Sequence, residues 1–250
     1  MKRLFFFSFI VLLFALPSCY NNKSQEQLRA ECDSLLHLAA DSYDADLREA
    51  AYNYYNQAIL LDTTYWRSYQ MKADAYYFDE KYDSAIVAYE KLYVLNRNHD
   101  TLTHGIFYRM ARSYHELELY EKALIIAQEG LLANPNDFWL MDEVSLCYTL
   151  QKKYDLAENW ALKELNTHEN DAAAYFRLAW INGKLGRTSK AIECYEQLLV
   201  LQPDNHAAMN NLSIHYWNRD RTKAIELKKK AAQLGNDKSR EWCKENGYDY

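Results

Sequence analysis

Six alanines recur along the chain at nearly one interval, with successive steps of 34, 38, 34, 34 and 33 residues. A helical pair of this length is too small to bury its own apolar face, so each pair has to stack against its neighbours. The period therefore predicts a stack of helical hairpins without a single central core. The alanines are Ala51, Ala85, Ala123, Ala157, Ala191 and Ala224.

The composition agrees with a helical array. Apolar residues make up 49% of the chain and charged residues 26%, which is ordinary for a folded domain. Only 6 glycines and 3 prolines occur among 250 residues, which favours helices with short connections. The formal charge of −6 becomes −8 once Lys2 and Arg3 are removed with a leader. This balance argues against a nucleic-acid partner, because phosphate binding needs a basic face.

The N-terminus has the features of an export signal. Lys2 and Arg3 precede an apolar run over residues 4–16, which is too short to cross about 30 Å of hydrocarbon at 1.5 Å per residue. The segment 16–19 resembles a bacterial lipoprotein signal, in which cleavage leaves Cys19 as the lipidated first residue. Simple secretion with an incidental cysteine is the alternative.

The lipoprotein resemblance implies a signal peptide over residues 1–18 and a polar tether over residues 19–27. Acyl chains such as palmitate on Cys19 would hold the protein on a membrane. Pro17 departs from the small residue usual at its position. We expect a location in the bacterial cell envelope, at the outer membrane and facing the periplasm.

A second pattern accompanies the alanines. In residues 104–137, a large residue, Phe107, is followed by Met110, Ala111 and Tyr114, and the same spacing recurs in the neighbouring units. This pattern resembles the tetratricopeptide repeat family, strongly over residues 66–205 and weakly on either side. The expected array occupies residues 28–250, with units at about 32–65, 66–99, 104–137, 138–171, 172–205 and 206–238 and a cap at 239–250.

The resemblance implies an all-α fold, a right-handed α-solenoid of about six helix-turn-helix repeats with a C-terminal capping helix. The step of 38 predicts extra residues at 100–103. We expect the cap to begin near Asp237, with Trp242 covering the apolar end of the stack. Small residues are expected where helices cross, at Ala73, Ala111, Ser145, Ala179 and Ser213.

In this family the first helix of each hairpin lines the concave face, which implies a partner site there. Large rings on a polar wall favour a protein or peptide with apolar anchors, and Arg67 and Arg112 are expected to take an acidic group. Asp74, His115, Leu146 and Ile214 are expected on the same face. The residues expected to bind the partner are Arg67, Gln70, Tyr77, Tyr108, Arg112, Trp139, Asp142, Phe176, Trp180, Asn210 and Trp217.

Residues with catalytic or metal-binding spacing are scarce. The segment 115–119 begins like a zinc-protease helix, but Leu119 stands where the second histidine is required. No glycine-rich phosphate loop is present, and no carboxylate is expected to have a raised pKa. We therefore expect no catalytic residue, no metal site, no cofactor and no enzyme activity.

Four cysteines remain after removal of the leader, and an even number outside the cytosol permits disulfides. Because a repeat array does not need such links, we expect buried free thiols. They are Cys32, Cys147, Cys194 and Cys243.

Three functions remain open from the sequence. The first is a non-catalytic, lipid-anchored scaffold that binds another protein or peptide on an aromatic-rich concave face. The second is a lipoprotein that binds a small ligand or glycan on the same face. The third, and the least supported, is an enzyme with a site between His99 and His115.

Overall fold

The structure is a computed structural model that describes residues 23–96 and 104–250. These residues form thirteen α-helices and no strand, which confirms the predicted all-α class. The expected signal peptide, Cys19, His99 and the extra residues 100–103 lie outside the described residues. The helices are α1 (Gln25–Asp44), α2 (Arg48–Leu61), α3 (Trp66–Phe78), α4 (Tyr82–Asn96), α5 (His104–Glu116), α6 (Tyr120–Ala133), α7 (Phe138–Leu150), α8 (Tyr154–Thr167), α9 (Ala172–Lys184), α10 (Thr188–Leu201), α11 (His206–Tyr216), α12 (Arg221–Gln233) and α13 (Asp237–Glu245).

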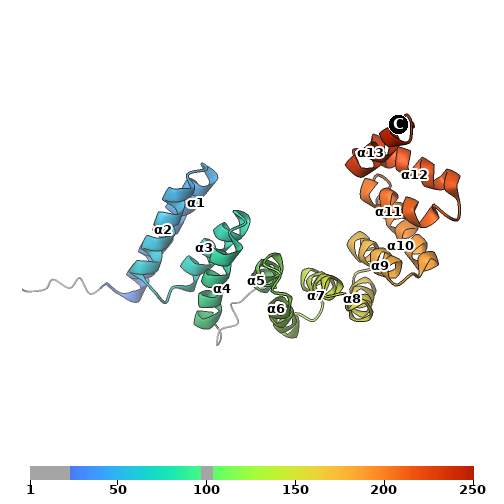
Figure 1. Ribbon diagram of the computed structural model, residues 1–250. Helices are drawn as coiled ribbons and strands as arrows, with labels where there is room; N and C mark the ends of the chain where they lie inside the picture. Colours follow the sequence, from blue (N-terminus) through green and yellow to red (C-terminus); the bar gives the residue numbers. More distant parts are fainter. Residues whose placement is uncertain (1–22, 97–103) are drawn as a thin grey trace, which may run out of the picture.

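Consecutive helices pair into six hairpins, and the hairpins follow one another along a curved row (Figure 1). Extensive contacts in the described parts join only helices that are one or two apart in chain order. The two ends of the row do not meet, so the chain is an open solenoid, as predicted. Helix α13 packs on α12 and closes the C-terminal end. Helix α1 begins at Gln25, within the segment expected to be a tether.

The core of the stack is built on small side chains. All six alanines of the repeat are fully buried, as are the five small residues expected at the helix crossings. A side chain that ends at Cβ or one atom beyond lets two helix backbones approach closely. Gly130 on α6 shows how tight this packing is, because an added Cβ would lie 2.6 Å from Leu140 Cδ1 and 2.8 Å from Phe107 Cβ.

The turn inside each of the first five hairpins has one common form. The second residue after the first helix has a positive φ between 57° and 71°. The next backbone N–H donates to a carbonyl five residues earlier, as in Leu119 N to Tyr114 O at 2.9 Å. This is a helix-ending motif with a left-handed residue. The left-handed residues are Asp46, Glu80, Glu118, Lys152 and Gly186.

Polar caps start several of the later helices. A side-chain oxygen of the residue before the helix accepts a backbone N–H from the first turn, which satisfies a donor that has no partner inside the helix. Asp137, for example, accepts from Leu140 N at 3.0 Å. Equivalent caps precede α9, α11, α12 and α13, at Asp171, Asn205, Asp220 and Asn236.

The capping helix spans Asp237–Glu245, as the sequence predicted. Its fully buried residues are Ser239 and Cys243, while Trp242 is half-buried. The ring of Trp242 packs edge-on against Trp217 and is stacked with Tyr248, with centroid distances of 5.6 and 5.3 Å. The end of the stack is therefore covered by the helix as a whole and not by Trp242 alone.

Two further properties of the described residues concern membrane-spanning helices and cysteines. None of their helices combines the length and the hydropathy needed to cross a bilayer. The four cysteines expected to be free are free, and three of them, Cys32, Cys147 and Cys243, are buried.

Candidate partner-binding face

The inner side of the curve is formed by the odd-numbered helices. From α1 to α9, successive odd-numbered helices contact one another, whereas successive even-numbered helices in the described chain make no comparable contact. We call the surface formed by α3, α5, α7, α9 and α11 the inner face. Ten of the eleven residues expected to bind a partner lie on these helices, and Trp217 is the C-cap of α11.

Ion pairs connect neighbouring hairpins across the N-terminal and central parts of the inner face. Asp74 on α3 accepts from Arg109 Nε and Nη2 on α5, at 2.9 and 3.2 Å. Asp142 on α7 accepts from Arg177 Nε on α9 at 2.8 Å and also from Arg177 Nη2. Each pair lies 35 residues apart, which is close to one repeat. Neither arginine is among the predicted residues, although opposite charges one repeat apart mark both pairs in the sequence.

The two arginines that were expected to take an acidic group already have carboxylate partners. Arg67 Nη1 lies 3.6 Å from Asp33 Oδ1. Arg112 Nη2 lies 2.6 Å from Glu116 Oε1, and its Nη1 lies 3.4 Å from Glu143 Oε2. The positive charge of these side chains is therefore balanced within the chain, and an acidic group of a partner would have to compete with these carboxylates.

The central part of the inner face carries a pair of neighbouring rings. Tyr108 on α5 and Trp139 on α7 have centroids 5.6 Å apart, and Trp139 remains 54% exposed. Burial raises the pKa of Tyr108 to about 12, so its hydroxyl is neutral at physiological pH. Gln70 and Tyr77 on α3 are half-buried. Trp139 is therefore the predicted ring with the most open surface.

The C-terminal part of the inner face is more apolar. Trp180 on α9 packs edge-on against Tyr154, with centroids 6.1 Å apart, and Phe176 packs against Tyr195 at 5.8 Å. Ile214 on α11 is 62% exposed. This part of the face thus offers apolar surface that packing within the chain does not cover.

Two adjoining hollows lie beside Ile214, with volumes of about 210 and 270 Å³. The residues that line them include Lys184 and Arg219 but no carboxylate. Gly183 lets His215 pack closely against α9, because an added Cβ would lie 2.8 Å from His215 Cε1. The first hollow is lined by Trp180, Gly183, Lys184, Tyr195, Asn211, Ile214 and His215, and the second by Thr188, Ile214, His215, Asn218 and Arg219.

Two predicted residues belong to the joint with the capping helix. Asn210 is 7% exposed, and its Oδ1 accepts from Lys228 Nζ at 2.7 Å and from Ser239 Oγ at 3.0 Å. It therefore links α11 to α12 and α13, and its assignment to the partner site is not supported. Trp217 packs against Trp242, with Arg221 Cζ 4.7 Å from its ring centroid.

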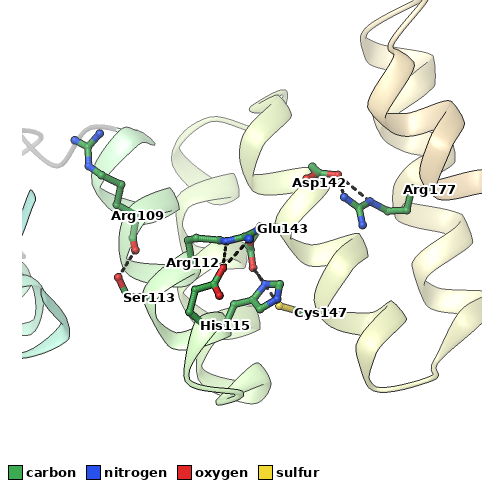
Figure 2. Close-up of polar contacts among 9 residues, drawn as sticks. Arg109, Arg112, Ser113, His115, Asp142, Glu143, Cys147 and Arg177 are labelled. Atoms are coloured by element: carbon green, nitrogen blue, oxygen red, sulfur yellow. Dashed lines mark hydrogen bonds and ion pairs between the residues drawn. The ribbon is translucent and has the colours of Figure 1, made fainter. Parts of the chain in front are cut away.

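A buried polar cluster that the sequence did not reveal lies between α5 and α7. Glu143 is fully buried and forms a hydrogen bond with His115 Nδ1 through its Oε1 (Figure 2). The same oxygen lies 3.5 Å from Cys147 Sγ. Burial, together with the charge of Glu143, raises the pKa of the Cys147 thiol, which keeps it protonated at neutral pH. These residues come from two hairpins, so no short motif marks them.

A larger hollow of about 750 Å³ lies between α3 and α4 and contains none of the predicted partner-binding residues. Its walls include the exposed Val87 and Val94 together with charged side chains of both signs, such as Lys91 and Glu90. It is separate from the site that the sequence predicted.

Comparison with known proteins identifies the repeats. Residues 67–99 and 172–205 each match a model described as the tetratricopeptide repeat, and they coincide with the hairpins α3–α4 and α9–α10. The chain contains tetratricopeptide repeats. Arrays of this kind present concave surfaces to other proteins or peptides and are typically scaffolds.

Solved structures and curated proteins extend the comparison. A crystal structure of YrrB, a tetratricopeptide protein with an unusual peptide-binding site, aligns with a TM-score of 0.61 and 19% sequence identity. The alignment covers 73% of this chain and 95% of the YrrB chain. A crystal structure of MamA aligns with a TM-score of 0.59 and 19% sequence identity. The alignment covers 70% of this chain and 94% of the MamA chain. These likenesses concern the fold.

Curated relatives match over a shorter span. BBSome complex member BBS4 from Mus musculus is 26% identical over 108 residues, or 43% of this chain. The same protein from Bos taurus matches equally. The match covers 21% of the length of each of these relatives, so the chain spans about a fifth of them.

The side chain of Glu164, which interacts electrostatically with Asp142 and Arg177, is a buried carboxyl group that was not predicted from the sequence. Glu164 on α8 is fully buried. Burial, reinforced by the charges of Asp142 and Asp171 and partly offset by Arg177, raises the pKa of Glu164 to about 9. The expectation that no carboxylate has a raised pKa is wrong here, and Glu164 is protonated at neutral pH.

Glu164→Gln is therefore expected to stabilise the array, and increasingly so as the pH rises. The folded pKa of about 9 exceeds the ordinary 4.5, so the wild type loses unfolding free energy between these values, by up to about 1.4 kcal/mol per pH unit. Glutamine mimics the protonated acid and does not titrate. Urea unfolding at pH 5 and pH 8 should show the advantage of the variant growing by roughly 2–4 kcal/mol.

The control for this measurement is the exposed Glu169→Gln, which should change little at either pH. An advantage of Glu164→Gln that is equal at pH 5 and pH 8 would show that Glu164 is not held protonated.

Proposed function

We propose that this chain is a non-catalytic scaffold in the bacterial cell envelope, anchored by a lipid on Cys19, that binds a protein or peptide on its inner face. The proposal narrows the site to the central and C-terminal parts of that face. The residues that carry it are Trp139 and Ile214, which are exposed by 54% and 62%, and Trp180 beside the adjoining hollows.

The distribution of charge supports a partner site in the central and C-terminal parts of the inner face. Toward the N-terminus, the arginines of the inner face are paired with carboxylates of the chain itself, so they attract a charged partner weakly. Toward the C-terminus, Ile214 is exposed beside both hollows, and Trp180 and Tyr195 make the first hollow mainly apolar, whereas polar side chains line most of the second. Apolar anchors of a partner gain most where they fill such hollows and exclude water.

The occupant that best fits this surface is an extended or helical segment with an apolar side chain for the first hollow and a polar side chain for the second. The hollows of about 210 and 270 Å³ are each large enough for one side chain, and they share Ile214 as a common wall. YrrB, which has the same fold, has a peptide-binding site, and this supports a peptide-like ligand here.

The partner site is tested with the double variant Trp139→Ala, Ile214→Ala. Both side chains are exposed, so the fold should be retained while anchor contacts worth about 2 kcal/mol or more are lost. Proteins crosslinked to the wild-type chain in envelope membranes should be recovered at least about tenfold less with this variant.

The matched control is Leu60→Ala, Val200→Ala on the even-numbered helices α2 and α10, where the side chains are 80% and 73% exposed. It should capture the wild-type set of proteins. Recovery of the same proteins at the same level by the inner-face variant would place the partner elsewhere.

The lipid anchor has its own test, since it rests on the leader and Cys19 alone. Replacing Cys19 with alanine removes the thiol to which acyl chains would attach. The variant is expected in the soluble fraction of the envelope, whereas the wild type sediments with membranes. A variant that still sediments with membranes to the same extent would contradict anchoring at Cys19.

Binding of a glycan or another small ligand is the second candidate, favoured by the open ring of Trp139 next to Tyr108. Exposed aromatic rings of this kind can stack on sugar rings. Calorimetric titration with soluble envelope glycans separates the candidates, because saturable heat that disappears in Trp139→Ala would indicate sugar binding.

A further inference from the structure

Three potential metal ligands from two hairpins converge beneath the inner face. His115 belongs to α5, and Glu143 and Cys147 lie one turn apart on α7. All three are buried, and one ligand atom from each lies within 4.8 Å of the other two. Figure 2 shows the ring of His115 and the sulfur of Cys147 on one side of Glu143, with Arg112 on the other.

We propose that His115, Glu143 and Cys147 form a binding site for one divalent ion of the zinc class. An imidazole nitrogen, a carboxylate oxygen and a thiolate sulfur are a donor set that suits such ions, whereas an all-oxygen set would suit magnesium or calcium. The Cys147 thiol releases its proton to solvent when the ion binds. Glutamate and cysteine at positions i and i+4 lie on one face of a helix, so both reach the same ion.

The spacing requires only a small adjustment. In a tetrahedral site with bonds of about 2.0–2.3 Å, ligand atoms lie roughly 3.3–3.7 Å apart. Cys147 Sγ already lies 3.5 Å from Glu143 Oε1. His115 Nδ1 is hydrogen-bonded to the same oxygen, and this contact has to open for the ion to replace the hydrogen between the two atoms.

Arg112 is the group that opposes a cation, and the structure gives it another partner. Its Nη1 lies 3.4 Å from Glu143 Oε2, whereas Nη2 and Nε lie 2.6 and 2.7 Å from Glu116 Oε1. The guanidinium therefore keeps Glu116 when Glu143 turns its other oxygen, Oε1, to the ion. Arg112→Gln removes the repulsion and should tighten metal binding.

A bound ion would join the third hairpin to the fourth. Because the ligands come from α5 and α7, binding holds these helices in the stacked arrangement and stabilises the folded chain in proportion to the free ion concentration. This role is independent of any partner on the inner face. The fourth coordination position would be taken by water, since three protein ligands are present.

Cobalt(II) alone is the probe, added to the purified chain that begins at Cys19. A thiolate bound to Co²⁺ gives an intense near-ultraviolet charge-transfer absorption, so one equivalent per chain is expected to produce this band and Zn²⁺ to abolish it. The band should disappear in Cys147→Ser. It should persist in Cys194→Ser, which removes a half-buried thiol elsewhere.

Absence of the band in the wild type, or its survival in Cys147→Ser, overturns the proposal. If Cys147→Ser does not fold by circular dichroism, His115→Gln replaces it. At least about tenfold weaker Co²⁺ binding in His115→Gln supports the site, and unchanged binding overturns it.

Discussion

Close approach of helix backbones at small side chains is the constraint on which this structure depends. Every alanine of the 34-residue ladder is fully buried, and the space around Gly130 would not admit even one additional carbon atom without displacement of Leu140 or Phe107. Packing of this kind buries apolar surface between neighbours in the row and does not create a shared centre. An open, curved stack is the result.

The stack then determines which polar side chains meet. Residues on successive odd-numbered helices come within reach only because the hairpins repeat in register, as the pairs Asp74–Arg109 and Asp142–Arg177 show. These pairs neutralise charge across the N-terminal and central parts of the inner face. The apolar surface near Ile214 remains open, and the proposed partner would exclude water there.

The fold was predictable because its signal is local and repeated. A small residue at each crossing, followed three positions later by a ring in four of the five units, places the helices and their pairing without knowledge of distant contacts. The positions of ten predicted residues on odd-numbered helices follow from the same register. Which of these residues are accessible to a partner was not predictable, because the exposure of each side chain depends on the packing around it. Trp139 is open, whereas Asn210 is held in the joint with α13.

The polar contacts and buried polar groups that were not predicted from the sequence arise where different hairpins or helices meet. The pairs Arg67–Asp33 and Arg112–Glu143, the protonated Glu164 and the cluster of His115, Glu143 and Cys147 all depend on residues from different helices meeting in space. Their sequence separations vary with the geometry of each joint. A motif search along one helix therefore sees an ordinary glutamate at 143 and an isolated cysteine at 147.

Small-angle X-ray scattering of residues 23–250 tests the open stack most directly. A globule of this length has a radius of gyration of about 17 Å. An open, curved row of hairpins should give a clearly larger value, with a distance distribution that has a long tail. A radius near 17 Å with a symmetric distribution would mean that the hairpins collapse onto one another, and the exposed inner face would not exist.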